Sequence, residues 1–163
     1  MAASGLRVMS FSSSLPSSSL SDMSEPLPCY RLSCVTRRPA APFADFLAGR
    51  QMVCCLREMD VGGLTKTFSF VVLPDRFHWL FALQRGATLA GLACRVRSAA
   101  SERMPGLRWQ RGMESVCYGV NDDLREAARY WVAQPVQMGL VTNVKHYALW
   151  DACWLEGDDV GKA

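Results

Sequence analysis

The sequence predicts an α+β fold, a ferredoxin-like antiparallel sheet with helices packed on it. Three observations support this fold class: short runs with the two-residue alternation of strands, longer stretches with apolar residues at helical spacing, and the element order β-α-β-β-α-β-α. Half of the 163 residues are hydrophobic and 20% are charged, which suits one packed domain. Because this fold hosts many unrelated functions, the fold class alone assigns none.

Composition divides the chain into three parts. Residues 1–27 are rich in serine and proline without a helical or strand period, so we expect a disordered segment that is neither a secretory signal nor a transit peptide. Residues 28–155 form the predicted domain, and residues 156–163 form an acidic tail. Met23 offers an alternative start of translation.

The first half of the domain contains a strand, a helix and a hairpin. Alternation from Cys29 to Thr36 predicts the strand. Residues 43–60 carry apolar side chains at helical intervals, and Gly62-Gly63 ends that helix. The β-rich runs 66–73 and 76–83 flank a proline–aspartate turn signal and therefore predict a hairpin.

The second half adds a helix, a strand and another helix. Thr88 can cap a helix that extends to Arg103, where a Met-Pro-Gly sequence breaks it. Residues 108–118 can form a further strand. Aspartates at the start of residues 122–134 cap the third predicted helix, and the aromatic segment that follows is predicted to be irregular.

Positive charge is concentrated in one segment. Residues 85–111 carry six arginines against Glu102 alone, a local charge of +5 in a chain whose net charge is +3. Such a field beside aromatic residues suits a polyanion, and a solvated helix face is the alternative interpretation.

Cysteine usage and hydropathy exclude some classes of protein. The seven cysteines are scattered and never spaced as Cys-x-x-Cys, which argues against a zinc knuckle and a disulfide framework. We interpret each as a small buried hydrophobe in a reducing cytoplasm. No apolar run approaches the roughly 18–20 residues that span a bilayer, so we expect no membrane span.

The strand predicted over residues 76–83 can place two potentially functional side chains on one face of the sheet. Side chains two apart share a face, so Arg76 and His78 lie together while Phe77, Trp79 and Phe81 face the core. A histidine pair at positions 76 and 78 would hold a metal ion over an open surface, whereas a single strand histidine is more often structural. The residues alone leave both interpretations open.

Tyr130 and Gln134 are four residues apart and project from one face of the third helix, which Pro135 ends. A tyrosine can attack a phosphodiester when a cation polarises the phosphate, and an amide oxygen can complete the shell of that cation. The alternative is a surface tyrosine and an amide at a helix end. The buried stripe of this helix is predicted to be Leu124, Ala127, Ala128 and Trp131.

Five sequence blocks, in this order and at this spacing, resemble the REP-associated tyrosine transposases, which belong to the HUH-type single-tyrosine transposases. The resemblance covers residues 28–155, and the blocks are more specific together than any one alone. The blocks are Pro74–Leu80 (PDRFHWL), Trp109–Gly112 (WQRG), Ala128–Pro135 (ARYWVAQP), Gly139–Val141 (GLV) and Trp150–Leu155 (WDACWL).

The resemblance implies a ferredoxin-like endonuclease that binds single-stranded DNA hairpins. Such enzymes cleave and rejoin DNA through a covalent 5′-phosphotyrosine, with Mg²⁺ or Mn²⁺ held by two histidines and an amide. By position, Tyr130 on the C-terminal helix matches the nucleophile, His78 the second histidine and Gln134 the amide ligand, for which relatives often have asparagine. Arg76 occupies the place of the first histidine and does not match.

Arg76 leads us to expect weak or absent cleavage. Guanidinium has no lone pair for a metal and stays positively charged, so binding of the divalent ion should be weakened or lost. Met113, Glu114, Ser115 and Gly119 also stand where the family tends to have an aromatic pair, an aspartate and an arginine. As a hypothesis, Arg76 contacts the scissile phosphate itself, because arginine binds phosphate oxygens in a bidentate way.

DNA binding should be less affected, because phosphate neutralisation and stacking are spread over many residues. The candidate DNA-binding residues are Arg95, Arg97, Arg108, Trp109 and Arg111. Their alternative roles are solubilising arginines and a packed tryptophan. We expect a bacterial cytoplasmic protein, monomeric or dimeric, that is nucleoid-associated when bound to DNA and has no membrane partner.

The leading interpretation is therefore a transposase-family protein that acts on single-stranded DNA hairpins, with impaired catalysis. The alternative is a non-catalytic DNA-binding or regulatory relic of such a transposase. A third interpretation, an unrelated ferredoxin-like RNA-binding domain, is disfavoured because the sequence has no paired aromatic sheet motif and does have the face formed by Tyr130 and Gln134.

Overall fold

The computed structural model describes residues 25–154. Most of the predicted disordered segment, the alternative start at Met23 and the acidic tail lie outside the described residues. The strands are β1 (Cys29–Val35), β2 (Thr65–Leu73), β3 (Arg76–Leu83), β4 (Glu114–Tyr118) and β5 (Trp150–Ala152). The helices are α1 (Phe46–Val61), α2 (Leu89–Arg103), α3 (Leu124–Val132) and α4 (Gln134–Gln137), with 3-10 turns η1 (Pro42–Ala44) and η2 (Val144–His146).

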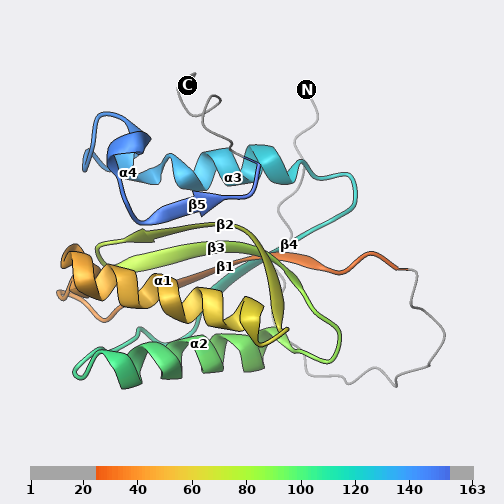
Figure 1. Ribbon diagram of the computed structural model, residues 1–163, viewed down its shortest axis with the longest axis horizontal. Helices are drawn as coiled ribbons and strands as arrows, with labels where there is room; N and C mark the ends of the chain where they lie inside the picture. Colours follow the sequence, from red (N-terminus) through yellow and green to blue (C-terminus); the bar gives the residue numbers. More distant parts are fainter. Residues whose placement is uncertain (1–24, 155–163) are drawn as a thin grey trace.

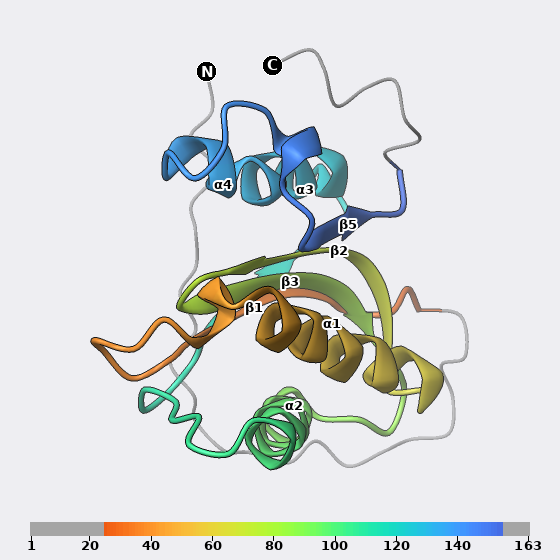
Figure 2. The ribbon, with the colours of Figure 1, turned by 60° about the vertical axis from the view of Figure 1, so that its left-hand side comes forward.

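The strands form one antiparallel sheet in the order β4-β1-β3-β2-β5. Because β3 lies between β1 and β2, the first β-α-β unit is split by an antiparallel strand, as in ferredoxin-like folds. Helices α1 and α2 cover one face of the sheet, and α3 and α4 lie on the other side (Figure 1), an arrangement that Figure 2 shows from a second direction. The predicted fold class is confirmed.

Aromatic side chains of β3 anchor the sheet to α1 and α2. Phe77, Trp79 and Phe81 are each 0% exposed and belong to the main hydrophobic core. Burial of one such side chain stabilises the fold by roughly 1.5–3 kcal/mol. The prediction that these three residues face the core is confirmed, and it leaves Arg76 and His78 on the opposite face of the sheet.

Side-chain caps set the starts of the first two helices. Asp45 accepts the amide of Ala48 at the start of α1, so the helix begins at Phe46 and not at residue 43 as predicted. Residues 42–44 form the preceding 3-10 turn. Thr88 accepts the amide of Gly91 and begins α2, as predicted.

The prediction of one strand over residues 108–118 is wrong for its first half. Gly112 has a φ of 78°, a left-handed conformation that glycine adopts readily and that interrupts an extended strand. Trp109 forms only an isolated bridge to Thr36, and β4 begins at Glu114.

The predicted helix over residues 122–134 is two helices. Asp123 accepts two amides and begins α3, which ends at Val132, and Gln134 begins the short α4. Pro135 explains the break, because it has no amide hydrogen for the preceding turn and restricts the residue before it. Tyr130 and Gln134 therefore do not share the face of one continuous helix.

The last segment is not irregular as predicted. Residues 150–152 form β5, which pairs with Ser69, Phe70 and Val71 of β2. The pairing is extended by a bond from the amide of Cys153 to the carbonyl of Phe68. A strand of three residues is too short to show alternation, so its pairing with the β2 edge was not predictable from periodicity.

All seven cysteines are free thiols, and two of them, Cys34 and Cys55, are buried. The prediction that each is a buried hydrophobe is wrong for four that are exposed, namely Cys54, Cys94, Cys117 and Cys153. Between residues 25 and 154 no helix has the length and apolar character needed to cross a membrane.

Candidate functional site

A polar cluster lies on the sheet face beneath α3. Arg31 and Ser33 come from β1, His78 from β3 and Glu114 from β4. The strand register brings them together, since Ser33 is the direct partner of His78 on one side and of Glu114 on the other. Trp131 of α3 packs over this cluster.

His78 is enclosed by the cluster. Its Nδ1 lies 2.6 Å from Ser33 Oγ, its ring centroid lies 4.2 Å from that of Trp131, and it is 8% exposed. Burial lowers the pKa of His78 from 6.5 to about 3, helped by the positive charges of Arg31 and Arg76. The imidazole is therefore neutral at physiological pH and is covered, unlike the open metal ligand that the sequence suggested.

Arg31 is the buried charge of the cluster, with 2% of its side chain exposed. It donates through one terminal nitrogen to Ser33 Oγ at 2.6 Å and through the other to the Glu114 carboxylate. Its guanidinium carbon lies 4.2 Å from the Trp131 ring centroid, a cation–π contact that ties α3 to the sheet. In the part of the chain that the structure describes, Arg31 Nε has no hydrogen-bond partner.

Ser33 joins Arg31 and His78 through its hydroxyl. Arg31 can only donate, so the Ser33 oxygen accepts from it. A hydroxyl has one hydrogen and two lone pairs, so Ser33 can either donate to Nδ1 of His78 or accept a hydrogen from it. In the second tautomer Nε2 of His78 keeps its lone pair.

Arg76 stands at the start of β3 and pairs with its neighbour Asp75. Its Nε and one terminal nitrogen donate to the two carboxylate oxygens at 2.9 and 3.0 Å. The hydrogen bond from Arg76 lowers the pKa of Asp75, and the same bond raises the pKa of Arg76. The other terminal nitrogen of Arg76 makes no bond within residues 25–154 and can still meet an anion.

A groove of about 680 Å³ opens beside the cluster. Arg76 and Arg111 contribute two guanidinium groups to its walls, and Glu114 contributes a carboxylate that is engaged by Arg31. The remaining lining residues are Ser33, Val35, His78, Gln110, Gly112, Met113 and Ser115. Two arginines next to hydroxyl and amide groups make this groove suitable for a phosphate group.

Tyr130 and Gln134 lie outside that lining. Tyr130 is 54% exposed on α3, and its ring meets Trp131 edge-on with 4.9 Å between centroids. The expectation that Tyr130 is not needed in the core is confirmed, and its role as nucleophile stays a prediction. Gln134 donates its side-chain amide to Gln137 at 3.0 Å, and its role as a metal ligand also stays a prediction.

Two of the five candidate DNA-binding residues hold a loop in place. Arg97 donates to the carbonyl oxygens of Gln110 and Gly112 at 2.6 and 3.3 Å, and Trp109 donates to the carbonyl of Arg97 at 3.2 Å. The Trp109 ring also packs edge-on against Phe77 of the core with 5.8 Å between centroids. The structure therefore agrees with the alternative role predicted for Trp109, that of a packed tryptophan.

The other three candidate residues are exposed arginines on different surfaces. Arg95 lies on α2, on the side of the sheet opposite α3 (Figure 1). Arg111 lines the groove beside His78, and Arg108 lines a second pocket. These positions do not form one patch, and the DNA-binding role of each stays a prediction.

The residues that the resemblance assigns to a metal do not fit a divalent cation. His78 has its Nδ1 bonded and its ring covered by Trp131, and Arg76 offers positive charge where a lone pair is needed. Gln134 donates to Gln137 through its amide nitrogen, a bond that does not use the amide oxygen that a cation would bind. Across the described residues, no group of three histidine, cysteine, aspartate or glutamate side chains is arranged to hold a metal ion.

Sequence reasoning missed the central member of the cluster, Arg31. The signal was present, because alternation along β1 places Arg31 and Ser33 on the face opposite Leu32 and Cys34. The sequence did not show which acidic residue pairs with Arg31. Glu114 follows Arg31 by 83 residues and is brought to it only by pairing of β4 with β1.

Solved structures share this fold. A REP-associated tyrosine transposase determined in complex with a REP hairpin matches with a TM-score of 0.61 at 16% identity, over 80% of this chain and 82% of its own. A Deinococcus radiodurans R1 protein, provisionally described as a transposase, matches with a TM-score of 0.51 at 15% identity, over 69% of this chain and 95% of its own. No protein-family model and no curated protein sequence matches the chain. The likeness in fold agrees with the resemblance of the five sequence blocks.

Proposed function

We propose that the protein is a relative of the REP-associated tyrosine transposases that binds single-stranded DNA hairpins and has lost metal-assisted cleavage. The observation that carries this proposal is the enclosure of His78 by Ser33 and Trp131 beside the buried charge of Arg31. A metal site needs several accessible lone pairs, and this one offers an arginine at position 76 beside a histidine that is only 8% exposed. This supports the non-catalytic alternative over an impaired enzyme.

Binding of the DNA backbone is supported by the groove beside the cluster. Arg76 and Arg111 line it, and arginine is the residue that binds phosphate oxygens in a bidentate way. In the family, the residue at the place of Arg76 binds the cation that would neutralise a phosphate. The guanidinium of Arg76 can supply that positive charge itself. The hairpin-bound transposase of similar fold supports a DNA hairpin as the partner.

Residual cleavage by Tyr130 is the second candidate function. One observation favours it: Tyr130 is exposed on α3 and touches Trp131, the residue that covers the cluster. Attack by its hydroxyl would form a 5′-phosphotyrosine and release a 3′-hydroxyl, with Arg76 as the cation at the phosphate. Without a metal ion this reaction should be slow. In either case we place the protein in the bacterial cytoplasm, with the nucleoid when bound to DNA.

Binding and cleavage of a fluorescent DNA hairpin test the proposal together. We expect measurable affinity that falls as salt is raised, because binding releases counterions from the phosphates. The double variant Arg76→Ala/Arg111→Ala should weaken binding by about tenfold or more. Arg50→Ala, an exposed arginine of α1 on the other side of the sheet, is the matched control and should bind as the wild type does.

The same samples incubated with Mn²⁺ distinguish binding from catalysis. We expect no covalent protein–DNA adduct on a denaturing gel. An adduct that forms in the wild type and is lost in Tyr130→Phe would establish the second candidate and refute the loss of cleavage. Absence of hairpin binding even at low salt would refute the proposed DNA-binding function itself.

A further inference from the structure

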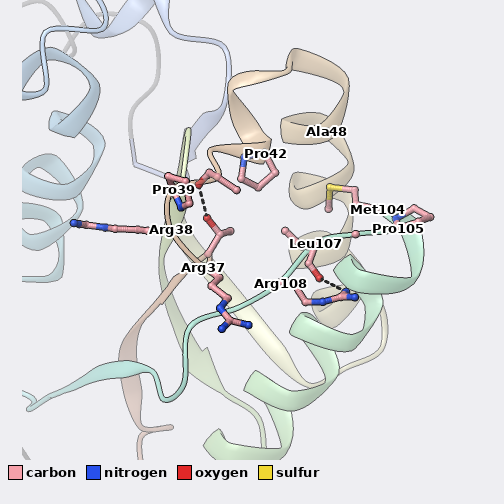
Figure 3. Close-up of a pocket in the computed structure, with 12 residues that line it drawn as sticks. Arg37, Arg38, Pro39, Pro42, Ala48, Met104, Pro105, Leu107 and Arg108 are labelled. Atoms are coloured by element: carbon pink, nitrogen blue, oxygen red, sulfur yellow. Dashed lines mark hydrogen bonds between the residues drawn. The ribbon is translucent and has the colours of Figure 1, made fainter.

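A second pocket, of about 430 Å³, lies between the loop that follows β1, the start of α1 and the segment that follows α2. Figure 3 shows Pro42 and Ala48 on one side of this pocket and Met104, Pro105 and Leu107 on the other. These side chains give the pocket an apolar floor. Its volume lies within the range of about 300–1,000 Å³ that small-ligand sites occupy.

Two arginines at the rim of the pocket lie opposite each other. Thr36 and Trp109 form an antiparallel bridge, and the amide of Arg37 donates to the carbonyl of Arg108 at 2.8 Å. Residues next to such a bridge on the two segments are cross-strand partners, so Arg37 and Arg108 form a facing pair. Like charges that face each other across paired strands destabilise the fold, and an anion between them would relieve the repulsion.

No carboxylate of residues 25–154 supplies that anion. Arg37 and Arg108 are exposed, and neither forms an ion pair with a described aspartate or glutamate. The residues that line the pocket include a third arginine, Arg38, and no acidic residue. The pocket therefore combines an apolar floor with uncompensated positive charge, which suits a ligand that is both apolar and anionic.

The walls of the pocket favour a peptide over a nucleotide. None of the residues that line it is aromatic, whereas unpaired bases are bound mainly by stacking on aromatic rings. The first turn of α1 also exposes Phe46 and Leu47, directly before Ala48 of the pocket wall. Large exposed apolar side chains mark protein interfaces, while surfaces that bind nucleic acid are more polar.

The loop that carries Arg37 and Arg38 is already held in place. The Thr36 hydroxyl donates to the carbonyl of Asp75 at 2.9 Å, and the amide of Phe43 donates to the carbonyl of Pro74 at 2.9 Å. These bonds fix both ends of the loop to the β2–β3 turn. Because the loop is ordered before a ligand arrives, binding costs less conformational entropy.

We infer that this pocket docks the C-terminus of a partner protein, an acidic segment that ends in an apolar residue. The terminal carboxylate lies between Arg37 and Arg108, and the terminal side chain lies on the apolar floor. Both groups leave the same Cα of a terminal residue, so one residue can reach the rim and the floor together. Arg38 remains for an acidic side chain that precedes the terminus, as in other arginine clusters that bind acidic motifs.

This site is independent of the proposed DNA-binding function, because no residue that lines the pocket also lines the groove beside His78. The docked partner and a DNA hairpin at the groove can therefore be bound by one molecule. The chemistry of the pocket specifies the class of peptide and leaves the hairpin site free.

Fluorescence anisotropy of a short labelled peptide with several aspartates and a C-terminal leucine tests the inference on the full-length protein. We expect a dissociation constant on the order of 10 µM. A C-terminal amide should weaken binding by about tenfold, because it removes the charge that pairs with the arginines. Serine in place of the terminal leucine should also weaken binding by about tenfold, because the apolar contact is lost.

Two double variants of equal charge change locate the site. Arg37→Ala/Arg108→Ala should weaken binding of the peptide by about tenfold or more and should make free and amidated peptides bind alike. The matched control is Arg50→Ala/Arg95→Ala, which removes two exposed arginines of α1 and α2 that do not line the pocket. Its affinity for the peptide should stay within about twofold of the wild type.

Ala48→Glu blocks the pocket without removing an arginine. The new side chain fills the space and supplies a carboxylate, so binding of the peptide should be lost. An acidic residue suits the first turn of a helix, and Ala48 is the third residue of α1, so the variant should fold. Circular dichroism and thermal unfolding of every variant check this.

Equal affinity for the free and the amidated peptide would overturn the inference, as would equal weakening in the Arg50→Ala/Arg95→Ala control. A single-stranded oligonucleotide that binds more tightly than the peptide and loses that affinity in Ala48→Glu would assign the pocket to nucleic acid and overturn it too. Peptide binding that appears only in Glu156→Gln/Asp158→Asn/Asp159→Asn would assign the pocket to the acidic tail of this chain instead.

Discussion

The indole of Trp131 lies over the imidazole of His78, with 4.2 Å between ring centroids and 40° between ring planes. The two residues belong to different layers of the fold, α3 and the sheet. Arg31 completes the stack from the neighbouring strand, 4.2 Å from the same indole. Trp131 thus covers the histidine that the family resemblance assigns to a metal ion, and the packing of the three side chains holds α3 on the sheet.

Trp131→Ala should loosen α3. We expect the free energy of unfolding to fall by about 2–4 kcal/mol, because the variant loses a large packed ring and its cation–π contact. Urea denaturation followed by circular dichroism measures the change. The neighbouring and exposed Tyr130→Ala is the control, and its loss should stay below about 1 kcal/mol. Equal losses would contradict the anchoring role of Trp131.

Acid should destabilise the fold through His78. The folded pKa of His78 is about 3 and the ordinary value is 6.5, so between these values the unfolded chain binds the extra proton. The stability that depends on a neutral His78 is fully present above pH 6.5 and is lost as the pH falls toward 3. The free energy of unfolding should fall by at most about 1.4 kcal/mol per pH unit.

The variant His78→Asn isolates this contribution, because asparagine stays polar and does not titrate. Its free energy of unfolding should fall less steeply between pH 6.5 and pH 4 than that of the wild type, both measured by urea denaturation. Parallel pH profiles of the two proteins would show that His78 is not kept neutral by the fold.

The Arg31–Glu114 pair should respond unequally to removal of either partner. Glu114→Gln leaves the buried guanidinium without its counter-charge and should cost about 1–3 kcal/mol of stability. Arg31→Met removes the buried charge and the unbonded Nε together, so its cost should be smaller. Thermal and urea unfolding of both variants measure which of them loses more stability. A larger loss for Arg31→Met would mean that the cation–π contact outweighs the cost of burying the charge.

Gly49→Ala should test the packing between α1 and the segment before β5. A Cβ at position 49 would lie 2.3 Å from Cδ1 of Leu149, which is 5% exposed. Overpacking of this kind costs about 1–3 kcal/mol, more than the roughly 0.5–1 kcal/mol that alanine gains over glycine in a helix. Stability should recover when Leu149→Ala is added, and a failure to recover would place the strain elsewhere.

Local signals predicted most of the fold. Thr88 and Asp123 begin their helices because their side chains accept backbone amides, a property visible in the residue type. The alternation in residues 76–83 correctly placed Phe77 and Trp79 in the core. The errors lie where one residue changes the backbone: Gly112 interrupts the predicted strand and Pro135 divides the predicted helix.

The candidate site was less predictable, because its contacts join distant parts of the chain. His78 was found from its strand position, but its enclosure depends on Arg31 and on Trp131. The sequence suggested Trp131 as part of a buried stripe without showing what it covers.

The short strand β5 covers the outer edge of β2. Without residues 149–153, the edge of β2 would expose the backbone groups of Phe68 to Val72, in a strand of nine residues that ends in Phe-Val-Val-Leu. An open, apolar edge of this kind invites pairing with another copy and growth of aggregates. Residues 150–152 cover that edge, so their removal should expose it and make the protein prone to polymerise.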